Sequence, residues 1–188
     1  MPDAVSALEG RSYRGFATVT EAGLTGMVSL RGDLASVDLA AALLAATGCA
    51  VPGLRRRVEA GAWAACWMSP DEVLLVGPHA AAPGVAAQLA GALAGQHALA
   101  VDVSDARASF RVAGPKAAEV LMKLSPVDFA SFGPDEVRRT RLGQIAATLW
   151  TSGAEDYTVL CFRSVAAYGF GVLQSAARPG SELFPGRG

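Results

Sequence analysis

The two halves of this chain carry the same order of structural signals at nearly the same spacing. In each half a strand ends in glycine just before a helix, at residues 28–32 (VSLRG) and 110–114 (FRVAG). Trp67 follows the first of these glycines by 35 residues, and Trp150 follows the second by 36. A short turn, an apolar strand and another helix come next in both halves. Shared element order together with shared spacing indicates an internal duplication.

The first half is expected to alternate between strands and helices. Residues 62–68 and 72–77 predict the two strands of a hairpin, because the Ser-Pro-Asp between them is a turn sequence. Residues 49–61, which contain a proline, two glycines and three arginines, are expected to form a loop. Residues 34–48 predict a helix that ends at a glycine. The apolar stripe expected on this helix consists of Val37, Ala40, Ala41 and Leu44.

In the second half, residues 138–163 predict a hairpin of two apolar strands. Ser164 is then a suitable N-cap for a last helix. Gly169 and Gly171 inside that helix each cost about 1 kcal/mol relative to alanine, which is tolerable if the helix packs closely against a sheet or a partner. The two glycines resemble a GxGxxG phosphate loop only superficially, because they lie inside a helical segment, and we reject dinucleotide binding.

These patterns predict an α+β fold of two tandem ferredoxin-like (split βαβ) units that form one compact domain. Each unit would supply a strand–helix–strand–strand–helix series, with one more strand available to it. The expected boundaries are an N-terminal arm over 1–14, a first repeat over 15–96, a second repeat over 97–178 and a C-terminal tail over 179–188.

Composition limits the classes of partner. Hydrophobic residues make up 52% of the chain and charged residues 18%, below the roughly 25% that is usual in soluble proteins. Abundant alanine and glycine would account for this, and so would apolar surface covered by a partner protein. The net charge of −1 and the isoelectric point near 6.1 argue against nucleic acid or an anionic membrane as the main partner.

The sequence predicts a cytoplasmic protein. No apolar run reaches the roughly 18 residues that a membrane span requires. The N-terminus has no basic segment followed by an apolar one, so we expect no signal peptide. Three cysteines (Cys49, Cys66 and Cys161) are an odd number without CxxC spacing, as expected for reduced, buried thiols.

No set of residues has the spacing of a catalytic or metal-binding site. Cys66 and Cys161 lie within apolar strands, where burial raises a thiol pKa and lowers its reactivity. Cys49 follows a helix end and is expected to be less buried. His79 and His97 are expected in exposed loops far apart in the sequence, so no metal-ligand cluster is predicted. We therefore predict no catalytic, cofactor-binding or metal-binding residue on this chain.

Two charged features have structural explanations that need no ligand. Asp102 and Asp105 flank a strand end, where Asp105 could form an Asx turn. Two groups of arginines could be solvated loop charges or could bind carboxylates of a partner protein. These groups are Arg55, Arg56 and Arg57, and Arg138, Arg139 and Arg141.

Several segments, in the same order, resemble the gamma subunit of heterotetrameric sarcosine oxidase. They are WMSPDEVLLVGP (67–78), DVSDARASFRVAGPKAAEVLMKLSPVDF (102–129) and RTRLGQIAATLWTS with YTVLCFRSVAAYGF (139–170), and the likeness covers most of residues 25–178. The phrase SFRVAGPKAAEVL is more distantly similar to the glycine-cleavage T-protein and related folate-binding proteins. That group is built from duplicated ferredoxin-like units, so the resemblance implies a T-protein-like domain.

The resemblance implies a noncatalytic structural subunit that assembles with alpha, beta and delta chains. In that family the complex oxidises sarcosine with oxygen to glycine, hydrogen peroxide and either formaldehyde or 5,10-methylenetetrahydrofolate. The resemblance places FAD and FMN on the beta chain, NAD and tetrahydrofolate on alpha and zinc on delta, with no cofactor on this chain. Unlike the T-protein, the chain is expected to lack an additional C-terminal barrel, and no folate-binding acidic residue can be assigned to a position here.

Two other functions stay open from the sequence. One is a stand-alone folate-binding protein of the T-protein class, which would bind a reduced folate without partners. The other is a self-associating interaction module without a ligand, which would form a symmetric homodimer. If the chain is instead a gamma-type subunit, we expect the isolated chain to be inactive and to be poorly soluble or to oligomerise.

Overall fold

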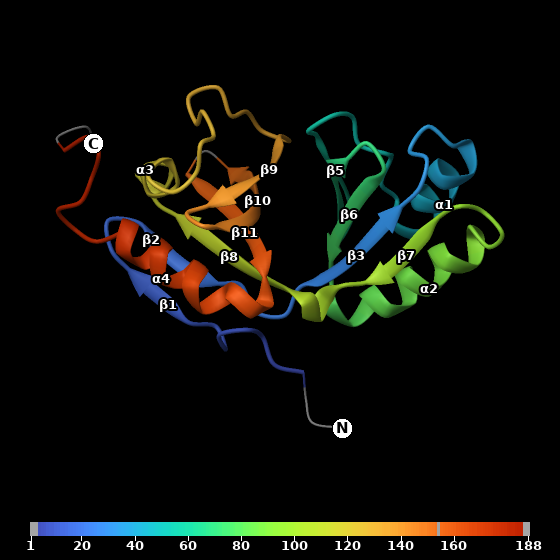
Figure 1. Cartoon of the computed structure of the whole chain (residues 1–188), viewed down its shortest axis with the longest axis horizontal. Coiled ribbons are helices and arrows are strands. Elements are labelled where there is room, and N and C mark those ends of the chain that lie inside the picture. Colours follow the sequence, from blue (N-terminus) through green and yellow to red (C-terminus); the bar gives the residue numbers. More distant parts are fainter. Residues whose placement is uncertain (1–3, 154, 186–188) are drawn as a thin grey trace. The chain divides into compact units, whose positions relative to one another are not determined.

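The computed structural model describes residues 4–153 and 155–185. The chain forms two compact units: unit 1 combines the described parts of residues 1–23 and 106–188, and unit 2 comprises Leu24–Asp105. Within the described residues, each unit has one antiparallel sheet and two α-helices (Figure 1). The α+β class expected from the sequence is confirmed.

Unit 2 is a five-stranded sheet with the strand order β4-β5-β6-β3-β7. Strands β5 and β6 are the hairpin predicted from the Ser-Pro-Asp turn. A 3₁₀ turn, η1 (His79–Ala81), leads from β6 into the second helix. In chain order the elements are β3 (Gly26–Arg31), α1 (Val37–Thr47), β4 (Arg57–Ala60), β5 (Trp63–Ser69), β6 (Glu72–Gly77), α2 (Ala82–Ala92) and β7 (Leu99–Asp102).

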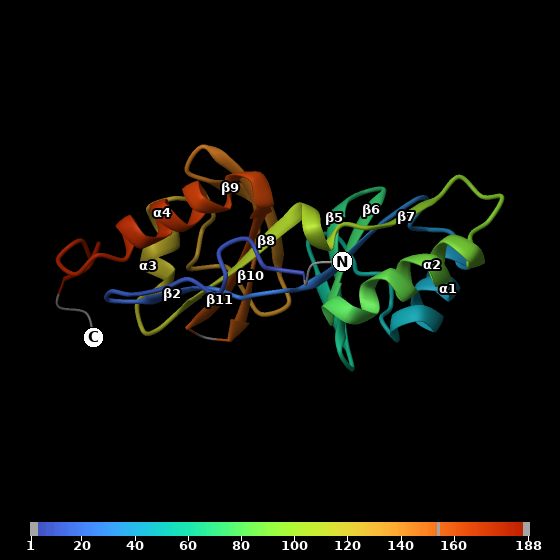
Figure 2. The same ribbon diagram turned by 90° about the horizontal axis from the view of Figure 1, so that it is seen from below.

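Both helices of unit 2 pack on one face of its sheet, as Figure 2 shows. Along their strands, Leu30 and Leu75 alternate with residues that point to the opposite face of the sheet. They belong to one core cluster with Leu43 of α1 and Leu89 of α2. Each of these leucines is 0% exposed, and burying one contributes roughly 1.5–3 kcal/mol. The repeated aliphatic contacts between sheet and helices therefore hold unit 2 together.

The C-terminal end of α1 agrees with the prediction, but the helix begins three residues later than predicted and its predicted apolar stripe is wrong. Ser36 caps the start and Gly48 ends the helix with φ 75°. The stripe residues Val37 and Leu44 are 81% and 55% exposed. Both faces of this alanine-rich helix have apolar residues at helical spacing, so periodicity could not decide which face meets the sheet. The residues that are buried are Leu39, Ala42, Leu43 and Thr47.

Unit 1 is a six-stranded sheet with the strand order β1-β2-β8-β11-β10-β9. Its two helices pack on one face of this sheet, in the same way as in unit 2. In chain order the elements are β1 (Ser12–Arg14), β2 (Thr18–Glu21), β8 (Arg107–Ala113), α3 (Ala117–Met122), β9 (Val137–Leu142), β10 (Ile145–Gly153), β11 (Asp156–Phe162) and α4 (Ala166–Ala176).

Helix α4 lies very close to the sheet of unit 1. The rings of Phe110 on β8 and Phe170 on α4 are 6.3 Å apart between centroids. A Cβ atom on Gly169 would lie 3.3 Å from the Phe110 ring and 3.5 Å from the sulfur of Cys161, so only glycine leaves this approach free of crowding. The close packing expected for the last helix is therefore found at Gly169, whereas Gly171 faces open space.

Four local predictions are wrong. The expected loop over 49–61 contains β4, and the expected two-stranded hairpin over 138–163 has three strands, β9, β10 and β11. The expected arm over 1–14 contains β1. Ser164 does not cap α4, because the chain enters that helix through a 3₁₀ turn, η3 (Arg163–Val165), without a side-chain cap. The missed strands are polar edge strands that are stabilised by pairing with a neighbour rather than by their own apolar pattern.

The compact units do not follow the sequence repeats. Strand β2 lies within residues 15–96 but pairs with β8 of unit 1, with Thr18 opposite Ala113. Strand β7 lies within residues 97–178 but pairs with β3 of unit 2. The boundaries between the units therefore fall after residues 23 and 105. The duplication of 15–96 and 97–178 remains a prediction about the sequence.

Candidate functional site

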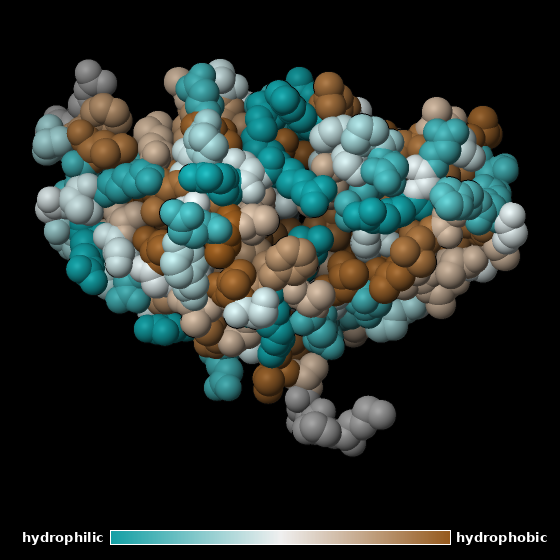
Figure 3. Space-filling view, in the orientation of Figure 1, coloured by the Kyte–Doolittle hydropathy of each residue, from teal (hydrophilic) through white to brown (hydrophobic). Residues whose placement is uncertain are grey.

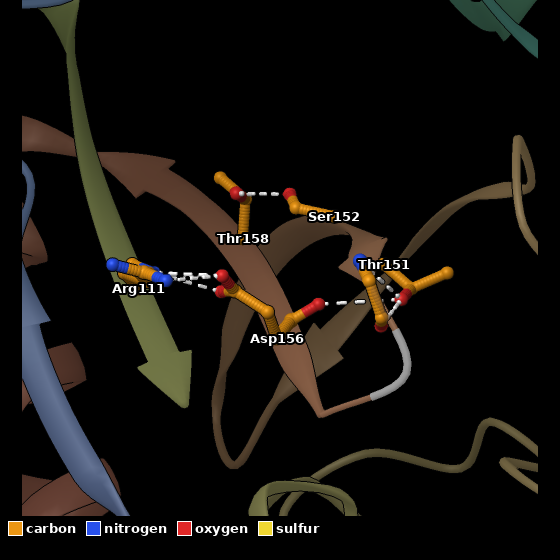
Figure 4. Close-up of polar contacts among 6 residues, drawn as sticks. Arg111, Thr151, Ser152, Asp156 and Thr158 are labelled. Carbon is orange, nitrogen blue, oxygen red and sulfur yellow. Dashed lines mark hydrogen bonds and ion pairs between the residues drawn. The ribbon is translucent and has the colours of Figure 1, made fainter. Parts of the chain in front are cut away.

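A cluster of polar side chains lies where β11 begins in unit 1 (Figure 4). Arg111 reaches across from β8 to Asp156, the first residue of β11. Its Nε atom is 2.9 Å from Oδ1 and 2.8 Å from Oδ2 of Asp156, and Nη2 adds a third contact to Oδ2. Hydrogen bonding to Asp156, followed by its charge, raises the pKa of Arg111. This bidentate pair fixes the start of β11 against β8.

The hydroxyl groups beside this pair bond to one another and to the backbone. Ser152 Oγ is 3.2 Å from Thr158 Oγ1, and Thr151 Oγ1 is 3.2 Å from the carbonyl oxygen of Asp156. Nucleophilic catalysis requires a base that accepts the hydroxyl proton and a group that orients the base. The hydrogen bonds of these hydroxyls instead stabilise the β10–β11 turn, so the cluster has a structural role.

Cys66 and Cys161 lie in the core, as predicted, with exposures of 0% and 1%. Burial raises the pKa of the Cys66 thiol to about 12, although Arg57 on the neighbouring strand lowers it in part. Burial likewise raises the pKa of Cys161 to about 11. Near neutral pH both groups are thiols rather than thiolates, and such thiols react slowly.

The prediction that Cys49 is less buried is wrong. Cys49 is 0% exposed, and its N–H donates to Thr47 Oγ1 at 3.1 Å. Its sulfur lies 3.5 Å from the carbonyl oxygen of Trp63. The glycine that ends α1 was predicted, and Gly48 has the αL conformation, but the sequence pattern does not show that the residue after it is buried.

Of the two histidines of unit 2, His79 lies next to the Asp102–Asp105 segment. His79 is half-buried in η1, with Nε2 4.0 Å from a carboxylate oxygen of Asp105, and His97 is exposed before β7. The Asx turn is formed by Asp102 rather than by Asp105. Its Oδ1 accepts hydrogen bonds from the N–H and the hydroxyl of Ser104, at 2.9 and 2.6 Å.

Two buried carboxylates hold the terminal segments of unit 1, and the sequence analysis missed both. Glu21 Oε2 accepts hydrogen bonds from the Ser6 hydroxyl at 2.8 Å and from the Gly10 N–H at 2.7 Å. Glu119 Oε2 on α3 accepts the N–H groups of Leu183 and Phe184, at 2.8 and 3.3 Å. A buried carboxylate needs such donors. Glu119 follows Ala117 and Ala118 on a helix and gives no sequence signal for this role.

An open hollow of about 700 Å³ lies at one end of the sheet of unit 2. Its lining includes Arg31, Asp33, Asp71 and His97. Arg31 is already paired with the carboxylate of Glu72, at 2.8 Å. The other charged lining groups also bond within the chain: Asp33 accepts the Ala35 N–H at 2.9 Å, and Asp71 accepts the Ser69 hydroxyl.

The two predicted groups of arginines lie in different units and in different settings. Arg55 is exposed with φ 58°, whereas Arg57 belongs to β4 and contacts Glu59. On β9, Arg138 pairs with Glu136 at 3.0 Å, and its guanidinium lies 5.3 Å from the ring centroid of Phe132. The remaining arginines of that strand, Arg139 and Arg141, are exposed. Whether a partner's carboxylates meet them stays a prediction.

The described residues also lack two other features. No group of three or more histidine, cysteine, aspartate or glutamate residues there is placed to hold a metal ion. No helix in the described part of the chain is both long and apolar enough to cross a membrane. On the face shown in Figure 3, hydrophobic residues form several separate groups among hydrophilic ones.

Comparison with known proteins gives one family. Residues 31–178 match the model of the sarcosine oxidase gamma subunit family. The sarcosine oxidase subunit gamma of Corynebacterium sp. (strain U-96) is 32% identical over 82% of this chain and 77% of its own length. That of Arthrobacter sp. is 35% identical over 64% of this chain, and the match spans 60% of that relative's length.

Solved structures agree with this assignment. A chain of the heterotetrameric sarcosine oxidase from Corynebacterium sp. U-96, in complex with pyrrole 2-carboxylate, matches 86% of this chain with a TM-score of 0.79 and 30% identity. The glycine cleavage system aminomethyltransferase T from Bartonella henselae matches 82% of this chain and 44% of its own, with a TM-score of 0.61 and 14% identity. The second likeness shows a shared fold, as expected for a T-protein-like domain. On these matches of sequence and structure, the chain belongs to the sarcosine oxidase gamma subunit family.

Proposed function

We propose that this chain is the gamma subunit of a heterotetrameric sarcosine oxidase and assembles with alpha, beta and delta chains. The observation that carries the proposal is the structural match at a TM-score of 0.79 and 30% identity to a chain from such a complex. The family match over residues 31–178 supports it independently. Apolar side chains left exposed on the chain, such as Leu99 and Phe162, supply surface that subunits could cover.

In this proposal the complex converts sarcosine, oxygen and water to glycine, formaldehyde and hydrogen peroxide. When tetrahydrofolate accepts the one-carbon unit, 5,10-methylenetetrahydrofolate forms instead of formaldehyde. FAD, FMN, NAD, tetrahydrofolate and zinc belong to the other subunits, and this chain is a noncatalytic, cytoplasmic component. The raised thiol pKa values and the structural use of the Arg111–Asp156 cluster support the noncatalytic role.

Co-expression tests this proposal. The chain is produced with candidate alpha, beta and delta chains, and the mixture is separated by size while flavin absorbance is followed. We expect all four chains to elute together with the flavin and with sarcosine-dependent production of hydrogen peroxide. If the other three chains assemble without this one, the proposal fails.

The fold likeness to aminomethyltransferase T supports one alternative, a stand-alone folate-binding protein. Titration of the isolated chain with a reduced folate, followed by calorimetry, distinguishes the two. Saturable one-to-one binding without partners would favour the alternative. No heat of binding, together with assembly of the complex, would favour the gamma subunit.

We also infer that the two units are duplicated ferredoxin-like units. A split βαβ unit has four strands in the spatial order 4-1-3-2. In unit 2 this order corresponds to β7-β3-β6-β5, with β4 as an extra strand. In unit 1 it corresponds to β2-β8-β11-β10, with β1 and β9 as extra strands. In unit 1 the fourth strand, β2, precedes the others in the chain, so unit 1 is a permuted form of unit 2.

Matching hydrogen bonds support the duplication. The Gly32 N–H donates to the carbonyl of Asp71 at 3.0 Å, and the Gly114 N–H donates to the carbonyl of Glu155 at 2.9 Å. The first bond joins the residue after β3 to the turn between β5 and β6, and the second joins the residue after β8 to the turn between β10 and β11. Both glycines have positive φ, at 158° and 124°. Descent of both units from one ancestral unit predicts that these two glycines have the same hydrogen bond and a positive φ.

A further inference from the structure

The sheet of unit 2 ends in a strand whose outer edge has no neighbouring strand among the residues that the structure describes. Strand β7 pairs with β3 on one side and is last in the strand order, as Figure 1 shows. Its side chains Leu99 and Val101 are 56% and 41% exposed. Of the features that protect such edges, β7 has a short length of four residues and the charged Asp102, but it has no lysine, proline or bulge.

The register of β7 shows which backbone groups face the open edge. The Val103 N–H donates to the carbonyl of Met27 at 2.8 Å, next to the paired residues Val28 and Asp102. In an antiparallel ladder, hydrogen-bonded pairs alternate with non-hydrogen-bonded pairs, so Val101 and Leu99 also bond to β3. The N–H and C=O groups of Ala100 and Asp102 therefore point away from β3, toward the open edge.

The corresponding edge in unit 1 is filled. Strand β2 pairs with β8 as β7 pairs with β3, and the Ala22 N–H donates to the carbonyl of Ser109 at 2.8 Å, the counterpart of the bond from Val103. On its other side β2 pairs with β1. The Glu21 N–H, the counterpart of Asp102 N–H, donates to the carbonyl of Arg11 at 2.8 Å. One of the two extra strands of unit 1, β1, thus lies at the edge that corresponds to the open edge of β7.

We propose that the β7 edge binds an extended segment of a partner subunit as a sixth, antiparallel strand, through the backbone of Ala100 and Asp102. The inference rests on the proposed function, because another subunit of the complex supplies the strand. Addition of a strand to a sheet edge is a common mode of peptide recognition, in which main-chain hydrogen bonds give affinity and side chains give specificity.

The side chains of β7 define the chemistry of that segment. In unit 1 the two positions that correspond to Leu99 and Val101 are Thr18 and Thr20. They lie opposite Arg14 and Ser12 of β1, and the Ser12 and Thr20 hydroxyl oxygens are 3.0 Å apart. Polar residues therefore face polar residues there. Because cross-strand neighbours match in character, the segment that binds β7 carries apolar side chains opposite Leu99 and Val101.

Amide hydrogen exchange in the wild-type complex tests the proposal. The chain is co-expressed with alpha, beta and delta, and exchange at Ala100 and Asp102 is compared between the purified complex and the dilute isolated chain. We expect exchange at both amides to slow by about tenfold or more on assembly, because each N–H gains a hydrogen bond in a stable structure. If the complex forms and both amides exchange as in the isolated chain, no strand is added and the proposal is overturned.

Variants add an independent arm. The double substitution Leu99→Lys/Val101→Lys places charges on the edge and should reduce the recovery of this chain with the complex by about tenfold or more. The conservative pair Leu99→Ile/Val101→Ile should assemble normally. So should the charge-matched control Ala87→Lys/Ala90→Lys, whose positions are exposed on α2. Equal recovery of the lysine pair at 99 and 101 and of the controls would contradict the proposal.

Two further outcomes separate this proposal from the proposed function. If the wild-type chain does not join the complex at all, the proposed function fails, and the proposed strand loses its source. If the isolated chain forms a homodimer in which the Ala100 and Asp102 amides are protected, a second copy rather than a partner subunit occupies the edge. The exchange measurement uses the wild-type chain, so it decides even if a lysine variant does not fold.

Discussion

The close contact between Gly77 and Trp63 predicts opposite effects for two glycine-to-alanine substitutions in unit 2. Gly77 ends β6, and a Cβ atom there would lie 2.6 Å from two carbons of the Trp63 indole, about 1 Å inside normal contact. Trp63 is only 9% exposed and packs in the core, so the ring cannot move freely. Gly84 in α2 has no atom within 4 Å of its Cβ position.

From this geometry, Gly77→Ala should lower the free energy of unfolding by about 1–3 kcal/mol, the usual cost of overpacking a core. Gly84→Ala should raise it by about 1 kcal/mol, because alanine is the better helix former. Urea unfolding of the dilute chain, followed by circular dichroism and tryptophan fluorescence, measures both. A Gly77→Ala variant as stable as the wild type, with unchanged fluorescence, would refute the assigned packing of Trp63.

Three other predictions concern the buried polar groups. Because burial raises the pKa of Cys66 from 9.0 to about 12, its thiol stabilises the fold at low pH and this contribution is lost as the pH rises from 9 towards 12. The free energy of unfolding of the wild type should fall by about 1.4 kcal/mol between pH 8 and pH 10, and Cys66→Ala should not show this fall. The same pH dependence in both proteins would contradict the prediction. Cys66→Ser and Cys161→Ser should each lower stability by roughly 1–3 kcal/mol without reducing turnover by the complex; abolished turnover at unchanged stability would contradict this. Glu119→Ala should release residues 178–185 and speed their proteolysis, and unchanged cleavage would show that Glu119 does not hold the tail.

The sequence predicted the elements with a strong apolar pattern and an obvious turn. The β5–β6 hairpin and the burial of Cys66 and Cys161 are examples, because a short strand made almost entirely of apolar residues is expected to be buried on both faces. Strands β4 and β9 were missed because half of the residues in each are charged, and pairing with β5 and β10 stabilises them as strands. The error in the stripe of α1 has a related cause, since alanine-rich helices have two faces of similar hydrophobicity.

The roles of individual polar residues were harder to predict than the fold. Glu21 and Glu119 bind backbone and side-chain donors that are distant in sequence or lie in the terminal segments, so no local pattern reveals them. The assignment of β2 to the sheet of unit 1 is also a long-range event, since its partner β8 lies about 90 residues away. Sequence spacing could suggest the duplication, but it could not show that the compact units are divided at other residues.

Native mass spectrometry of the co-expressed complex tests the central claim most directly. If this chain is a noncatalytic gamma subunit, the complex contains it together with alpha, beta and delta, and the chain released on gentle activation has the 19.2 kDa mass of the bare polypeptide. Release of this chain with a bound flavin, nicotinamide or folate would contradict the account. So would an active complex of the other three chains that excludes it.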